Sequence, residues 1–172
     1  MHPSSVENMR LCRAKYLQYW TPEMPILDVG GRGLNKDRSY RQVFPEAKVY
    51  SVADILDGKG VTHVMVGPYE LPFEDDSFDL ILSGQMLEHC KNPFRSVAEM
   101  TRVLKQGCRM ALIAPSAGPK HDTIDCWRFM DDSFAAIAEE TGLKIIADWI
   151  QHVSPDERSM KWRDHVFVGE KP

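Results

Sequence analysis

The stretch from Pro25 to Asn35, PILDVGGRGLN, decides the fold of this chain. A short apolar run, Ile26 and Leu27, reaches the acid Asp28 and stops at a cluster of glycines. This pattern predicts a buried parallel strand over 26–29 that ends in a tight turn. Glycine there permits a positive φ and removes the Cβ that would hold a ligand away from the backbone. Ligands bind at the carboxyl ends of the strands in an open α/β sheet, so the turn is a candidate binding site.

The composition is that of one ordinary globular domain spanning residues 1–172. The chain is 43% apolar and 27% charged, and its net charge of −4 provides no basic excess to attract nucleic acid. No run approaches the ~20 apolar residues that cross a membrane. The four cysteines form no CxxC pair, which favours free thiols in a reducing cytoplasm over a zinc site or a redox dithiol. No metal site is expected.

A second strand over 48–52 leads to Asp54. This acid lies about two dozen positions beyond the glycine turn, which is the separation typical of an acid that bonds ribose hydroxyls. A carboxylate suits a ribose because it accepts hydrogen bonds from both hydroxyls at once. The alternative is a surface acid that ends a strand. The glycine turn on the same chain favours the ribose interpretation.

The remaining elements alternate between helix and strand. The N-terminal segment 1–24 contains a helix over 4–20, and further helices are expected over 39–43, from Asn92-Pro93 to a stop at Gly107, and from Asp131 or Asp132 to about Thr141. Strands are expected over 62–66, 79–83, 110–114, 143–150 and 165–169. Alternation of this kind predicts an α/β sheet with right-handed crossovers. The last two strands lack an intervening helix and therefore form an antiparallel hairpin.

Three motifs in this order resemble the class I S-adenosylmethionine-dependent methyltransferases. They are ILDVGGRG, the acid of VYSVADI, and LPFEDDSFDLILSGQMLEH followed by a helix and VLKQGCRMALIAP. The resemblance implies a Rossmann-like, mostly parallel sheet of seven strands in the order 3-2-1-4-5-7-6, with an antiparallel last strand and helices on both faces. The segments GGRGLNKDRSYR and HDTIDCWRF are similar to a small bacterial subgroup associated with sugar, cell-surface or secondary-metabolite methylation.

The same resemblance implies S-adenosylmethionine as the cofactor and S-adenosylhomocysteine as the product. Asp28 would position the methionine end, Asp54 the ribose, and the 67–69 loop the adenine edge. The implied cofactor residues are Asp28, Gly30, Gly31, Arg32, Gly33, Asp54, Ile55, Gly67, Pro68, Tyr69, Ser83, Gly84, Gln85 and Met86. Two departures stand out. Arg32 either pairs the cofactor carboxylate or faces solvent, and Gly67 stands where many members have an acid or amide.

The implied chemistry is an in-line displacement of sulfur by an oxygen or nitrogen of the acceptor. Positioning supplies much of the rate, and a base is needed only when the acceptor must lose a proton. The base candidates are His89, His121 and Asp125. His89 either lies near the methyl group or ties down its loop, and His121 is either a base or an exposed loop residue. Asp125 either orients His121 or pairs Arg128.

The acceptor is expected to be a small molecule or a sugar-like metabolite. Trp127 and Arg128 offer aromatic and cationic surface to it, or else pack at the start of the next helix. The N-terminal helix, the loop around His121 and the loop over 154–163 would form its walls. Two other interpretations stay open: a catalytically weak cofactor-binding or partner-dependent subunit, and an RNA or protein methyltransferase. An oligomer or a partner subunit that completes the site stays open as well. A nicotinamide-dependent oxidoreductase is disfavoured because GGRGLNKDRSY lacks a full GxGxxG.

Overall fold

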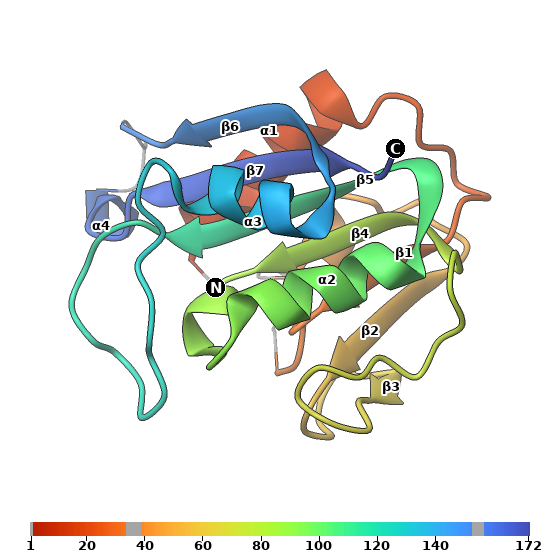
Figure 1. Cartoon of the computed structure of the whole chain (residues 1–172), viewed down its shortest axis with the longest axis horizontal. Helices are drawn as coiled ribbons and strands as arrows, with labels where there is room; N and C mark the ends of the chain where they lie inside the picture. Colours follow the sequence, from red (N-terminus) through yellow and green to blue (C-terminus); the bar gives the residue numbers. More distant parts are fainter. Residues whose placement is uncertain (1, 34–38, 153–156) are drawn as a thin grey trace.

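A single seven-stranded sheet forms the frame of the molecule (Figure 1). The computed structural model describes residues 2–33, 39–152 and 157–172. The strands are β1 (Ile26–Val29), β2 (Tyr50–Asp54), β3 (His63–Val64), β4 (Phe78–Gly84), β5 (Leu104–Pro115), β6 (Lys144–Ile150) and β7 (Asp164–Glu170). The helices are α1 (Pro3–Tyr16), α2 (Pro93–Val103), α3 (Ser133–Thr141) and α4 (Glu157–Met160), with 3-10 turns η2 (Tyr40–Gln42) and η3 (Leu87–His89).

The strand order is β3-β2-β1-β4-β5-β7-β6, which confirms the predicted topology. The pairs from β3 to β5 are parallel, and β7 runs antiparallel to both β5 and β6. The four residues of β1 are all buried, between β2 and β4, and Asp28 pairs with Val52 and Leu82. The strand order changes direction between β1 and β4, because β2 and β3 lie on one side of β1 while β4 and β5 lie on the other. Such a switch point is where an α/β sheet binds its ligands.

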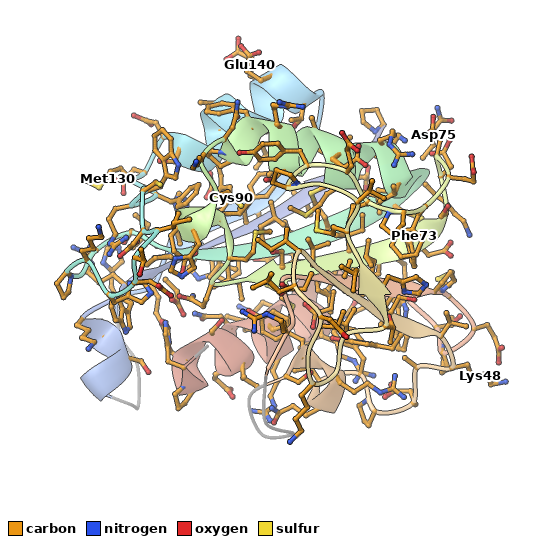
Figure 2. All side chains as sticks on the ribbon, turned by 90° about the horizontal axis from the view of Figure 1, so that it is seen from below. Lys48, Phe73, Asp75, Cys90, Met130 and Glu140 are labelled. Atoms are coloured by element: carbon orange, nitrogen blue, oxygen red, sulfur yellow. The ribbon has the colours of Figure 1, made fainter. Side chains whose placement is uncertain are left out.

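Each face of the sheet is covered by helices, as predicted. Leu27 and Ile81 pack against α2 and α3, while Ile26 and Leu80 pack against α1 and η2. Figure 2 shows the two helical layers on opposite sides of the strands. Successive side chains of a strand point to opposite faces, so a continuous apolar run such as that of β4 serves both cores. Among the described residues, no helix is both long and apolar enough to cross a membrane.

The ends of several elements differ from the sequence prediction. Helix α1 ends at Tyr16 rather than near Trp20, because Leu17 leaves the helical region with φ −116° and ψ 26°. Helix α2 ends at Val103, and the extended Leu104 enters β5 at once to pair with Phe78. Gly107 is therefore not a helix stop; it lies inside β5 with φ +72°.

Two further differences concern the segments around the site. Strand β2 begins at Tyr50 and includes Asp54, two residues later than predicted at each end. The loop over 154–163, expected to be irregular, contains the short helix α4. Residues 154–156 of that loop lie outside the described residues, as do Leu34 and Asn35 of the opening stretch.

Candidate functional site

A cavity of about 480 Å³ opens at the carboxyl ends of β1, β2 and β4. Its wall includes nine of the residues predicted from the sequence: Gly30, Arg32, Asp54, Ile55, Pro68, Tyr69, Gln85, Met86 and His89. The cavity lining does not include the other predicted cofactor residues, which are Asp28, Gly31, Gly33, Gly67, Ser83 and Gly84. The volume falls in the range of small-molecule sites, which is about 300–1,000 Å³. The elements named from the sequence thus converge on one cavity.

The glycine turn after β1 clears space for neighbouring side chains of the protein. Gly30 has φ +83°, and a Cβ there would lie 2.4 Å from Cγ of Met86. A Cβ on Gly31 would lie 2.8 Å from Cγ1 of Val52 and 3.1 Å from the Asp28 carboxyl carbon. The 2.4 Å and 2.8 Å distances are shorter than carbon atoms tolerate, and the 3.1 Å distance is tight. The turn therefore needs glycine at 30 and 31 for its own packing, before any ligand is considered.

Asp28 is buried beneath this turn. The Tyr50 hydroxyl donates a hydrogen bond of 2.8 Å to its Oδ2. Burial raises the pKa of Asp28 to about 7, the Tyr50 hydrogen bond opposes that rise, and the nearby Asp54 charge adds to it. Asp28 therefore supports the turn from below, and its charge state changes near neutral pH.

Asp54 lies at the end of β2 and contacts Arg32. The Arg32 Nε lies 3.3 Å from Oδ1 of Asp54, and the Arg32 backbone N–H donates to Oδ2 over 3.4 Å. The Arg32 side chain is 43% exposed and that of Asp54 12%. The sequence offered two interpretations of Arg32, solvent or the cofactor carboxylate, and in this structure the guanidinium instead pairs with Asp54. These bonds are long and partly solvated, so the Asp54 carboxylate keeps acceptor capacity toward the cavity.

The end of β4 divides its residues between the sheet and the cavity. Ser83 Oγ donates to the Val29 carbonyl over 2.9 Å and so joins β4 to β1, while Gly84 leaves room for the Tyr40 ring of η2. Gln85 follows with φ +57°, an uncommon conformation for a residue other than glycine. Its Nε2 donates to Oδ1 of the buried Asp164 over 3.0 Å. Gln85 and Met86 line the cavity.

The loop after β3 forms an apolar wall with one aromatic ring. The hydroxyl of Tyr69 accepts a hydrogen bond from the Asn92 backbone N–H over 3.0 Å, and the Arg95 guanidinium carbon lies 4.7 Å from its ring centroid. Gly67 stands where many family members have an acid or amide, and the carboxyl group of Glu70 lies close to it in the structure. A Cβ on Gly67 would lie 3.6 Å from the carboxyl carbon of Glu70.

The loop after β5 is organised around Asp125. The Oδ2 atom of Asp125 accepts from the backbone N–H of His121 and lies 2.9 Å from its Nδ1. Arg128 pairs with both carboxylate oxygens, over 2.5 and 2.8 Å, and this pairing holds the pKa of Asp125 well below its usual range. Both sequence interpretations of Asp125 are therefore present together. The pair fixes His121 relative to the loop.

Trp127 and Arg128, which the sequence suggests either meet the acceptor or pack at the start of the next helix, both donate hydrogen bonds to backbone carbonyls. Arg128 donates to the Gly118 and Pro119 carbonyls, and Trp127 Nε1 donates to the Cys90 carbonyl over 2.8 Å. Neither side chain belongs to the cavity lining. Trp127 connects the loop after β5 to the segment after β4, and Arg128 bonds within the loop after β5.

His89 lines the cavity and also ties down a loop. Its Nδ1 lies 2.6 Å from the carbonyl oxygen of Ile124, and its ring centroid lies 5.0 Å from that of His121. Its Nε2 lies 3.6 Å from Oε1 of Glu88, a fully buried acid that was not among the predicted site residues. Burial raises the pKa of Glu88 to about 7. Glu88 directly precedes His89 in the LEH motif, and this position was the one sequence feature that could have identified it as a site residue.

Several cavity residues were not singled out from the sequence. Helix α2 contributes Ser96, Glu99 and Met100, whose spacing places them on one side of a helix. The other additions are Val29, at the end of β1, and seven loop residues: Leu56, Met65, Leu71, Cys90, Lys91, Asp122 and Ile124. The helical spacing was visible in the sequence, but which side of α2 meets the cavity depends on how the helix packs on the sheet.

A sequence model of the family described as "Methyltransferase domain" matches residues 41–112. A C-methyltransferase of ubiquinone/menaquinone biosynthesis from Shewanella piezotolerans is 28% identical over 162 residues, covering 81% of this chain and 64% of that protein. The YcgJ protein of Bacillus subtilis superimposes with a TM-score of 0.69 at 18% identity, and the match covers 99% of each chain. The 1,6-didemethyltoxoflavin-N1-methyltransferase of Burkholderia thailandensis superimposes with a TM-score of 0.73 at 12% identity, covering 98% of this chain and 79% of that one.

The chain has the class I S-adenosylmethionine-dependent methyltransferase fold. The strand order that the resemblance implied is confirmed. The match to the methyltransferase domain model, which covers less than half of the chain, agrees with the family resemblance of the three motifs. The chain spans less than two thirds of the length of the first curated relatives that it matches. Within this chain, the methyltransferase domain model matches from η2, which follows the glycine turn, into β5.

Proposed function

We propose that this protein is an S-adenosylmethionine-dependent methyltransferase that acts on a small-molecule acceptor. The observation that carries the proposal is the cavity at the switch point of the sheet, which brings the glycine turn, the Asp54 carboxylate and the residues after β4 to one wall. The solved N-methyltransferase that superimposes on this chain is described with S-adenosylhomocysteine bound, which supports the same cofactor here.

The residues around the cavity fit this cofactor. Asp54 offers carboxylate oxygens suited to the ribose hydroxyls, and the apolar side chains of Ile55, Leu56 and Met65 suit the faces of an adenine ring. Glu70, beside Gly67, is an acid near the position where the family pattern places one. Arg32 would exchange its contact with Asp54 for one with the cofactor carboxylate, a geometry that suits guanidinium groups.

The bound cofactor supplies an activated methyl group on a sulfonium centre. The protein's own contribution is to hold the acceptor in line with that group and to keep the cavity free of competing water. Gln85 and Met86 reach the cavity from the end of β4, and Gln85 is fixed in place by its bond to Asp164. His89 borders the same cavity, so a proton leaving an oxygen or nitrogen acceptor has an imidazole close by.

The acceptor would enter at the end of the cavity lined by His89, Asp122 and Ile124, which belong to the segments after β4 and β5. The relatives support a small molecule but differ in the acceptor atom, since one is named a C-methyltransferase and another an N1-methyltransferase. An oxygen or nitrogen of a sugar-like or other metabolite is our proposal, because a loop with polar side chains borders this end of the cavity.

The cofactor assignment is tested by calorimetric titration of S-adenosylmethionine and S-adenosylhomocysteine into wild-type protein and Asp54→Asn. Losing a charge-assisted hydrogen bond costs about 1.5–3 kcal/mol, so the affinity of the variant should fall roughly 10- to 150-fold. The matched control is Asp131→Asn, an exposed acid outside the cavity, which should bind as the wild type does. Equal affinity in the two variants would remove Asp54 from the site.

A result without any cofactor binding would favour the other interpretation from the sequence, a subunit that needs a partner. That interpretation predicts that adding the partner restores binding. It is separated from a misfolded preparation by the circular dichroism spectrum, which must show the α/β content described above.

A further inference from the structure

Glu88 is a buried acid whose side chain has no hydrogen-bond partner among the described residues. It is 0% exposed, and neither Oε1 nor Oε2 accepts a hydrogen bond there. Burying an ionisable group without partners is costly, and native proteins rarely leave one in that condition. The Nε2 atom of His89 lies 3.6 Å from Oε1 of Glu88, which is beyond hydrogen-bonding distance. Something other than these protein groups is needed to satisfy the carboxylate.

Two imidazoles, those of His89 and His121, lie near this carboxylate. The Nδ1 of His89 faces the Ile124 carbonyl at 2.6 Å; a carbonyl only accepts, so Nδ1 carries the proton and Nε2 carries the lone pair. The Nδ1 of His121 lies 2.9 Å from Oδ2 of Asp125, and this carboxylate is held ionised by Arg128. His121 therefore also donates from Nδ1 and keeps Nε2 as a lone-pair donor.

This arrangement matches the outer contacts of metal-bound histidines. A histidine that ligates a metal almost always donates its second ring N–H to a backbone carbonyl or a carboxylate, which fixes the tautomer and the ring. Here one histidine uses the Ile124 carbonyl and the other uses the Asp125 carboxylate. One ligand atom from each of Glu88, His89 and His121 lies within 4.8 Å of the other two.

We propose that Glu88, His89 and His121 form a binding site for a divalent transition-metal cation of the Zn²⁺ type. Two imidazoles and one carboxylate are a donor set that such cations favour, and three protein ligands leave a coordination position open. In a tetrahedral zinc site the ligand atoms lie roughly 3.3 Å apart, given bond lengths near 2.0–2.1 Å. The Glu88–His89 separation of 3.6 Å is already close to that value. The separations to the His121 ligand atom are at most 4.8 Å, so that atom has to move inward by no more than about 1.5 Å.

The site borders the cavity through His89. A cation there would place a Lewis acid beside the end of the cavity that we assign to the acceptor, where it would lower the pKa of a bound water or hydroxyl. His89 belongs to both proposals: with a cation bound, its Nε2 would be a ligand, and a metal-bound hydroxide rather than the imidazole would take the proton that leaves the acceptor. The test of the metal site involves no cofactor, so its outcome is separate from that of the proposed methyltransferase activity. This proposal replaces the expectation from the sequence that no metal is bound.

The test is a titration of chelator-stripped, full-length protein with Zn²⁺ by calorimetry, repeated with Co²⁺ while its visible absorption is recorded. The expected result is one cation per chain and the intense absorption of four- or five-coordinate Co²⁺. Zinc at 100 times its dissociation constant should also raise the midpoint of thermal unfolding by about 5–10 °C.

Two variants locate the cation. His121→Ala and Glu88→Gln should each weaken Zn²⁺ binding by more than about 100-fold, which exceeds the 10- to 100-fold loss typical of outer contacts. The control is His63→Gln, which removes an imidazole on β3 and should leave binding unchanged. If Glu88→Gln does not fold, His121→Ala decides alone, because His121 is a partly exposed loop residue.

Absence of Zn²⁺ binding in the wild-type protein would overturn the proposal. So would binding of equal strength in wild-type protein and His121→Ala, since that result would place the cation elsewhere, for example on the exposed Cys126.

Discussion

Gly30 shows how one residue can be required for reasons internal to the fold. It combines a φ of +83° with a collision between any Cβ and the Cβ and Cγ of Met86. Gly33, three residues later, shares the positive φ of +72° but has open space around it. The two glycines therefore separate the cost of the backbone conformation from the cost of the close approach.

The Gly30→Ala variant should be destabilised more than Gly33→Ala. Left-handed conformation costs a residue with a side chain about 1–2 kcal/mol, and overpacking against Met86 adds about 1–3 kcal/mol at position 30 alone. The comparison is made from urea unfolding midpoints of the two variants. Equal losses would mean that Met86 moves aside at little cost.

Asp28 makes stability depend on pH in a definite direction. Its pKa is about 7 in the folded chain, because burial opposes the charged form, against about 3.9 when unfolded. Between these values the folded state holds a proton that the unfolded state releases, so the free energy of unfolding falls as pH rises from about 4 to 7. The stabilising contribution of the proton is complete below pH 4 and lost above pH 7.

Asp28→Asn should therefore be more stable than the wild-type protein at pH 8, by an amount on the order of a few kcal/mol, and the gain should shrink toward pH 4. The asparagine carbonyl can still accept the Tyr50 hydroxyl. The measurement is the difference between the unfolding free energies of the two proteins across this range. Glu88 has the same pH dependence in both proteins, so it cancels in the difference. A difference that does not change with pH would contradict the account.

At the scale of elements, helix α2 depends on the cap at its start. The Asn92 side chain accepts a hydrogen bond from the Arg95 backbone N–H over 3.1 Å, and Pro93 begins the helix. Asn92→Ala should lower the free energy of unfolding by about 1 kcal/mol, while Asn92→Asp should retain the cap. Thermal unfolding of the two variants checks this. Equal losses in both would mean that the cap does not depend on a side-chain oxygen acceptor.

The elements that could be predicted from the sequence are those with strong local signals. The bounds of strand β1 could be predicted because an apolar run stops at glycines. The end of α3 could be predicted because a glycine, Gly142, follows it, and in the structure this residue takes φ +71°. The end of α2 could not be predicted, since Leu104 leaves the helix to pair with Phe78, a residue distant in the sequence. Such pairing is decided by tertiary structure rather than by the residues at the helix end.

The same distinction applies to the site. Asp54 and the glycine turn carry sequence signals because their spacing reflects the βαβ arrangement that brings them together. The buried position of Glu88, the Asp125 contacts and the cavity side of α2 arise only when loops after β4 and β5 pack against each other. The LEH motif gives the identity of Glu88, but it does not indicate that the side chain is buried or that it lacks a hydrogen-bond partner among the described residues.

At the scale of the whole molecule, we propose that the cavity at the switch point binds S-adenosylmethionine. The most direct measurement is amide hydrogen exchange of the wild-type protein with and without S-adenosylhomocysteine, followed by peptide mapping. The account predicts slower exchange in the segments after β1, β2 and β4, at residues 30–33, 54–58 and 84–90, with little change in β6. Binding with protection confined to other segments, or no protection at all, would contradict it.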